Sequence, residues 1–213
     1  MKIYFLSGLG ADKSVFHFLD LSFCEPVFLD WIPALPGETL AAYAPRMREL
    51  IPDEHPYIVG ISFGGMLAVE IAKRDTAIKA FIISSAKTKH ELPAWIRACK
   101  YFPAYKWLPD GLMRFIASKC NWLFGAEQKA SIKIFKQIIA ESNVPFNTWA
   151  VNAVVHWDNE TVPPNVFHIH GTLDLLLPYR CVTCNASVKH GKHLMVMDHA
   201  EEVDEVMREY FIA

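Results

Sequence analysis

The chain has 213 residues, of which 52% are apolar and 21% are charged, and its formal net charge at pH 7 is −2. This composition excludes a disordered chain and fits one domain that buries a sizeable core. The charge balance argues against a nucleic acid or an anionic membrane surface as the main partner, because the chain lacks a strongly basic block.

The first apolar residues predict a strand over Lys2–Ser7 rather than a signal peptide, because Gly8, Gly10 and Asp12 interrupt the run at once. No later run approaches the roughly 18 apolar residues that a membrane-spanning helix needs. We therefore expect a soluble, cytoplasmic protein.

Strands and helices then alternate as far as Ser84. Apolar runs and helical spacing predict, in chain order, helix Ser14–Leu21, strand Pro26–Trp31, helix Thr39–Ile51, strand Pro56–Ile61, helix Phe63–Arg74 and strand Ala77–Ser84. This alternation implies a parallel sheet with helices on both faces.

The pattern becomes mostly helical and aromatic over about residues 87–163. From there to the end of the chain, the predicted elements are helices Glu127–Ser142 and Pro145–His156, strands Asn165–His170 and Ala186–Lys189, and helix Ala200–Tyr210. The expected fold class is α/β, a single domain over residues 1–213 with a mostly parallel, doubly wound sheet. A helical cap is expected to be inserted at about 87–163.

The strongest chemical signal is Gly60-Ile61-Ser62-Phe63-Gly64, which lies directly between a predicted strand and a predicted helix. This G-x-S-x-G pattern is typical of a nucleophile elbow, a sharp turn that raises a serine hydroxyl above a sheet. Side chains two residues before and after the serine would collide with the neighbouring strand and helix, so glycine is needed there. Ser62 is therefore the candidate nucleophile, and the alternative is an ordinary glycine-rich turn with a solvated serine.

A serine hydroxyl needs a base that takes its proton, and on this scaffold the order along the chain is serine, acid, histidine. Asp174 follows the predicted strand Asn165–His170 by a short turn, where ligand-facing residues collect in open α/β sheets. It is the candidate acid, unless it only stabilises that turn.

Three histidines follow the last predicted strand, and His193 is the favoured base because it lies in a glycine-containing loop before the final helix. His199 and His190 are the alternatives. His199 lies next to the predicted helix start, which it would merely flank, with Asp198 as a possible N-cap.

Two backbone N–H groups are the candidate oxyanion hole. The amide of Phe63 lies at a helix N-terminus, and the amide of Leu9 belongs to the loop after the first strand. Asp12, just beyond, either lines the pocket mouth or caps the helix from Ser14, and capping is favoured.

Metal and redox sites are not favoured. His168 and His170 share one face of a buried strand, so packing is the preferred interpretation over metal binding. Cys181 and Cys184 form a C-x-x-C pair without a second pair to complete a metal site, and are interpreted as buried or half-buried thiols rather than a redox or half-zinc site.

The arrangement of these motifs along the whole chain resembles the α/β-hydrolase superfamily, and especially small bacterial serine hydrolases that begin with a strand followed by S-G-L-G-A-D. The residues that carry the resemblance are Ser7–Asp12, Gly60–Gly65, His170–Pro178 and Gly191–Val203. It implies the α/β-hydrolase fold, a Ser62–Asp174–His193 triad and cleavage of an ester or another acyl bond. The A-E-E-V segment after His193 stands at the distance from the catalytic histidine that such proteins show.

The chain also departs from the family pattern. Many relatives have His-Gly where this chain has Ser7-Gly8, and the first strand corresponds to the third strand of the full fold, as if the N-terminus were trimmed. The stretch between Asp174 and His193 is short for the usual intervening helix.

The expected function is hydrolysis of a small or medium hydrophobic ester through an acyl-enzyme, with no metal or cofactor required. Aromatic residues of the insert suggest an apolar pocket, although most of them should pack the cap onto the core: Trp95, Tyr101, Phe102, Trp107, Phe115, Trp122, Phe124 and Trp149. Two alternatives stay open: a lyase or C–C bond hydrolase on the same scaffold, and a binding protein with a silent triad. The sequence does not define the oligomeric state.

Overall fold

The computed structural model describes residues 1–212, which contain one sheet of six parallel strands. The strands are β1 (Lys2–Leu6), β2 (Glu25–Phe28), β3 (Tyr57–Ile61), β4 (Lys79–Ile83), β5 (Val166–Gly171) and β6 (Ala186–Val188). Their spatial order is β2-β1-β3-β4-β5-β6, and every neighbouring pair is parallel. The expected parallel α/β sheet is confirmed.

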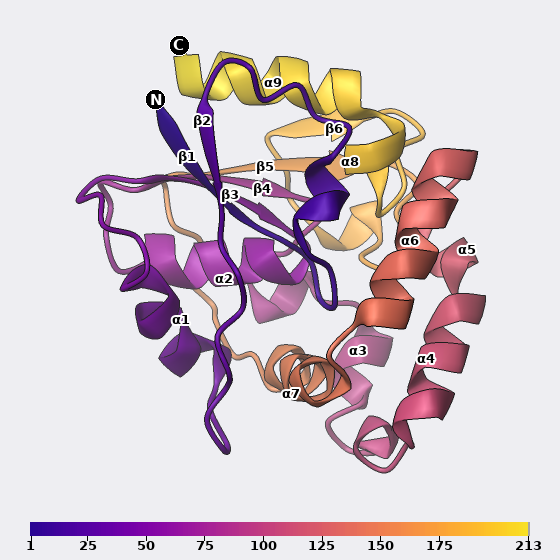
Figure 1. The fold of residues 1–213 in the computed structure, drawn as a ribbon. Helices are drawn as coiled ribbons and strands as arrows, with labels where there is room; N and C mark the ends of the chain where they lie inside the picture. Colours follow the sequence, from indigo (N-terminus) through magenta and orange to yellow (C-terminus); the bar gives the residue numbers. More distant parts are fainter. Residues whose placement is uncertain (213) are drawn as a thin grey trace.

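Helices cover both faces of this sheet (Figure 1). They are α1 (Leu40–Arg48), α2 (Phe63–Ala72), α3 (Ala94–Ala98), α4 (Asp110–Lys119), α5 (Asn121–Phe124), α6 (Lys129–Glu141), α7 (Val144–Val155), α8 (Met195–Asp198) and α9 (Ala200–Ile212). Short 3-10 helices lie at Lys13–Phe16, Lys89–Glu91, Ala104–Lys106 and Tyr179–Cys181. None of the helices within residues 1–212 combines the length and the apolar character needed to cross a bilayer.

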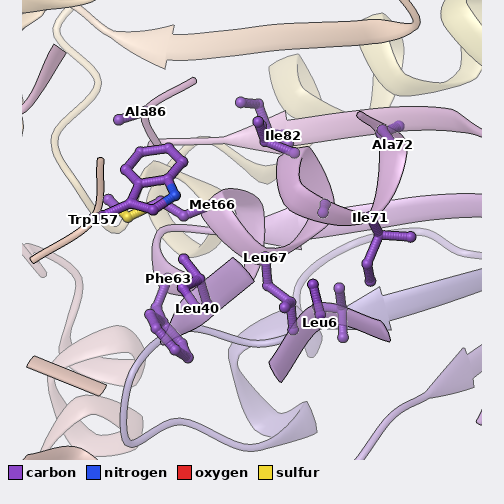
Figure 2. Packing of buried hydrophobic residues seen from close by; sticks show 14 of the residues in the cluster. Leu6, Leu40, Phe63, Met66, Leu67, Ile71, Ala72, Ile82, Ala86 and Trp157 are labelled. Carbon is purple, nitrogen blue, oxygen red and sulfur yellow. The ribbon is translucent and has the colours of Figure 1, made fainter. Parts of the chain in front are cut away.

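The two faces of the sheet pack into two hydrophobic clusters, because alternate residues of a strand point to opposite sides. In β1, Tyr4 and Leu6 join α1, α2 and α7 in one cluster, whereas Ile3 and Phe5 join α8 and α9 in the other. Figure 2 shows side chains of α2 directed into the first cluster. Burial on both faces explains why the strands read as continuous apolar runs.

The strand order reverses between β1 and β3. The chain leaves β1 for β2 on one side and returns to β3 on the other. Loops that follow the two strands therefore diverge and leave a crevice at their carboxyl ends, where open α/β sheets bind ligands. Helices α3–α7, which connect β4 to β5, gather at this side of the sheet (Figure 1).

The predicted helix over Ser14–Leu21 is wrong. Only a 3-10 turn at Lys13–Phe16 forms, capped by Asp12, whose Oδ1 accepts the Ser14 N–H at 3.0 Å. Val15 and Phe16 are buried in the core, and a second turn closes from Leu19 N–H to Phe16 O. Two consecutive tight turns bury Val15 and Phe16, and this packing outweighs the weak helical pattern of the sequence.

The predicted role of Asp198 as N-cap of the last helix is also wrong. Its carboxylate accepts hydrogen bonds from the N–H groups of Glu127 and Gln128 at 2.9 and 3.2 Å, and from the Ser131 hydroxyl. Asp198 therefore stabilises the positive N-terminal end of α6, about 70 residues earlier in the chain.

Candidate active site

Ser62 occupies a strained turn between β3 and α2. Its φ is +51° and its ψ is −115°, a conformation that residues with a side chain rarely adopt. The turn is held by the Ser62 N–H, which donates to Ile83 O at 2.9 Å, and by the Ser85 hydroxyl, which donates to Ser62 O at 2.7 Å. This turn conformation lifts the Ser62 side chain clear of the sheet and into the crevice beside β1.

Close backbone packing explains the two glycines of the motif. A Cβ atom at Gly60 would lie 2.4 Å from Gly64 O, and one at Gly64 would lie 2.3 Å from Ser7 O and 2.4 Å from Leu6 O. These are backbone atoms on neighbouring segments, so no side-chain movement would relieve the clash. The absence of side chains lets α2 begin directly against the end of β1.

His193 connects Ser62 to Asp174. Its Nε2 lies 2.9 Å from Ser62 Oγ, and its Nδ1 lies 2.7 Å from Asp174 Oδ2. His193 and Asp174 are only 2% and 3% exposed, so bulk water competes little for these hydrogen bonds. The structure thus brings together the three residues that the sequence singled out.

The Asp174 carboxylate is held by the turn that follows β5. Its Oδ1 accepts the N–H groups of Leu176 and Leu177, each at 2.8 Å, which leaves Oδ2 for the His193 ring. These two donors were not predicted from the sequence, although an aspartate that opens a short turn commonly accepts amides two or three residues on.

The alternative histidines lie elsewhere. His199 Nδ1 is 2.9 Å from Glu202 Oε1 at the start of α9, and His190 is exposed. Neither contacts Ser62 or Asp174.

The residues of the two candidate oxyanion donors line the same cavity. Leu9 and Phe63 line one cavity with Ser62 and His193, and a Cβ at Gly8 would lie 3.7 Å from Ser62 Cβ. Among residues 1–212, no protein acceptor takes a hydrogen bond from the N–H of Leu9 or Phe63. Neither amide is therefore used by a hydrogen bond within the described chain. The hydroxyl of Ser7 donates to Ala11 O at 2.7 Å and so braces this loop.

An apolar cavity of about 260 Å³ opens beside Ser62. Helices α3, α5, α6 and α7 and the segment between β5 and β6 supply about half of its lining residues: Trp95, Ile96, Phe124, Phe135, Ile138, Val151, Val154, Val155, Leu176 and Leu177. Its described lining contains no Asp, Glu, Lys or Arg. A wider groove of about 940 Å³ shares Ala11 and Ile138 with this cavity.

The expectation that most aromatics of the insert pack the cap onto the core is wrong. Trp95 and Phe124 line the cavity, and Trp149 packs on Tyr43 and Phe63. The remaining five are exposed to solvent: Tyr101, Phe102, Trp107, Phe115 and Trp122. Aromatic content alone does not reveal which side chains of a segment face solvent.

Two buried histidines lie behind the acid. His170 Nε2 is 2.8 Å from Leu177 O, so this nitrogen carries the hydrogen, and Nδ1 accepts from His168 Nε2 at 3.0 Å. His170 Nε2 is also 3.4 Å from Asp174 Oδ2. The thiols of Cys181 and Cys184, by contrast, are half-buried and form no disulfide within the described chain.

Because these two histidines are buried, we expect the free energy of unfolding to fall in mild acid. Burial lowers the pKa of His168 well below its usual value, with a further contribution from His170, and burial also lowers the pKa of His170. Below a pH of about 6.5 these histidines bind protons in the unfolded chain but stay neutral in the folded chain. The free energy of unfolding should therefore fall with decreasing pH, by up to about 1.4 kcal/mol per pH unit for each histidine.

Urea denaturation across this pH range measures that slope. His168→Gln should flatten it, whereas a substitution at the exposed His55, His55→Gln, should leave it unchanged. An equally steep slope in His168→Gln would contradict the assignment.

Comparison with solved structures finds the same architecture in several hydrolases. A lipase-esterase related protein from Clostridium acetobutylicum is 16% identical, with a TM-score of 0.71 over 99% of this chain and 94% of that one. An esterase from Exiguobacterium antarcticum is 15% identical, with a TM-score of 0.74 over 100% and 92% of the two chains. A hydrolase from Pseudomonas aeruginosa is 12% identical, with a TM-score of 0.76 over 100% and 90%. No protein-family model and no curated protein sequence matches the chain.

Proposed function

We propose that this chain, which has the α/β-hydrolase fold, is a serine hydrolase that cleaves a small or medium hydrophobic ester. The observation that carries the proposal is the continuous hydrogen-bonded series from Ser62 Oγ through His193 to Asp174, built on a strained turn. The esterases among the similar structures support the same reaction class.

In the proposed reaction, His193 Nε2 takes the Ser62 proton while Oγ attacks the ester carbonyl carbon. Asp174 keeps the proton on Nδ1 and stabilises the imidazolium that forms. The N–H groups of Phe63 and Leu9 stabilise the oxyanion. The imidazolium protonates the departing alcohol, and water activated by the same imidazole then hydrolyses the acyl-enzyme.

The size and the lining of the cavity suggest which acyl group the protein would accept. At about 260 Å³ it lies below the range of roughly 300–1,000 Å³ common for drug-sized ligands, and its lining is apolar. A short or medium apolar acyl chain fits, and a charged acyl group would be desolvated without a partner. Helices α3, α6 and α7 would act as the cap over this group, and the wider groove would receive the alcohol portion.

A fluorophosphonate probe tests the proposed nucleophile. The native protein should be labelled and should hydrolyse p-nitrophenyl esters with a preference for uncharged acyl groups, and Ser62→Ala should abolish both. Ser187→Ala, which removes an exposed hydroxyl, is the matched control and should behave like the native protein.

The outcome also separates the alternatives. Labelling without ester turnover would favour other chemistry on the same triad, such as C–C bond cleavage. A folded protein that is neither labelled nor active would be a binding protein with a silent triad.

A further inference from the structure

The outer surface between α3 and α5 exposes an unusual set of aromatic rings. We name it the aromatic face: Tyr101, Phe102, Trp107, Phe115 and Trp122, which are 58–80% exposed. Half of the chain's six tryptophans are exposed, and all three of these lie between residues 95 and 122. Single exposed apolar side chains are normal on a protein surface, but a cluster of large ones usually marks an interaction site.

Helix α4 is oriented with its apolar side outward. Leu112, Phe115 and Ile116 follow helical spacing, so they share one side of the helix, and all three are exposed. The polar Arg114 points the other way and donates to Ser142 O at 2.9 Å, at the end of α6. An amphipathic helix normally buries its apolar side against the protein, so this one is arranged for a partner outside it.

Basic residues surround these rings. Residues 94–123 contain five Lys or Arg and one Asp, a local net charge of +4 in a chain whose net charge is −2. The Lys100 ammonium lies 5.0 Å from the Tyr101 ring centroid, and that of Lys119 lies 5.5 Å from the Phe115 ring centroid. The whole-chain charge conceals this local excess, which is why composition argued against an anionic membrane surface.

We propose that the aromatic face binds the surface of an anionic lipid membrane. Tryptophan and tyrosine rings suit the boundary between acyl chains and headgroups, and lysines with apolar stems place their ammonium groups among anionic headgroups. A second copy of this chain would instead bring two basic surfaces together, each with Lys100 and Lys119 beside its rings. Charge complementarity thus favours the lipid.

The aromatic face also leads towards the cavity beside Ser62. Trp95 and Ile96 of α3 and Cys99, just after that helix, line the cavity. Tyr101 and Phe102 come two and three residues after Cys99. At the right of Figure 1, α3, α4 and α5 lie on the side of the molecule opposite the N-terminus and α1. An ester dissolved in the membrane would have a short apolar path from the bilayer to the cavity beside Ser62. This consequence rests on the proposed function, whereas the proposed membrane binding does not.

Co-sedimentation with vesicles tests the binding. Vesicles of phosphatidylglycerol and phosphatidylcholine in equal parts should retain the protein, phosphatidylcholine vesicles should retain much less, and high salt should weaken binding. Replacing two exposed rings, as in Phe102→Ser with Trp107→Ser or Phe115→Ser with Trp122→Ser, should weaken partitioning about tenfold or more. Ser62→Ala should bind like the native protein, which separates this result from the proposed reaction.

The matched control removes two exposed apolar side chains elsewhere, Val162→Ser with Ile212→Ser, and should leave partitioning unchanged. The aromatic variants should keep their circular dichroism and their turnover of a water-soluble ester. The proposal is overturned if these variants bind vesicles as well as the native protein does. It is equally overturned if light scattering shows a dimer that they dissociate while no form of the protein binds vesicles.

Discussion

Replacing His193 by alanine should reduce ester turnover by about 10³-fold or more, with little change in KM. The imidazole is the only group that the structure places within hydrogen-bond distance of Ser62 Oγ on one side and Asp174 Oδ2 on the other, among residues 1–212. Without it, the Ser62 hydroxyl stays protonated at neutral pH and is a poor nucleophile. Steady-state kinetics with a p-nitrophenyl ester measure the loss.

His199→Ala is the matched control, because this ring bonds to Glu202 and not to the site. It should retain turnover within about twofold of the native rate. Denaturation curves should show that His193→Ala remains folded, since the substitution also removes a buried hydrogen-bonding group. Near-normal rates in His193→Ala would move the assignment to another base, with His199 tested next.

The features that sequence analysis predicted well are those that depend on local pattern. The strand–Ser62–helix unit combines an apolar run, the G-x-S-x-G spacing and an apolar helix, and its boundaries differ from the predicted ones by one or two residues. Asp174 was identified because parallel strands bring loops from their carboxyl ends to one edge, and His193 because it lies in a glycine-containing loop before the final helix. The order of motifs along the chain therefore carried information about proximity in space.

Other features depend on contacts that local pattern does not specify. Asp198 serves the start of α6 rather than the helix that follows it in the chain. The spacing of Leu112, Phe115 and Ile116 shows that they share a side of a helix, but not whether protein or solvent covers that side. The buried series from His168 through His170 to Leu177 similarly required knowledge of where the β5–β6 turn folds back.

Gly64→Ala should destabilise the protein by at least about 2 kcal/mol and abolish most ester turnover. The added Cβ would lie 2.3 Å from Ser7 O and 2.4 Å from Leu6 O, so either α2 or the end of β1 must move. Movement of β1 would also displace the Leu9 amide, which is proposed to stabilise the oxyanion. Urea denaturation measures the loss in the free energy of unfolding, and ester kinetics on the folded fraction measure the displacement.

Gly111→Ala provides the matched control, because a Cβ at Gly111 would have no atom within 4 Å. Since Gly111 lies within α4, alanine should leave the free energy of unfolding unchanged or raise it by up to about 1 kcal/mol. A Gly64→Ala protein as stable as this control would show that the contact between α2 and β1 tolerates a side chain. The close approach of Ser7 and Leu6 would then not explain the motif's second glycine, which lies in α2 and has no positive φ that would require glycine.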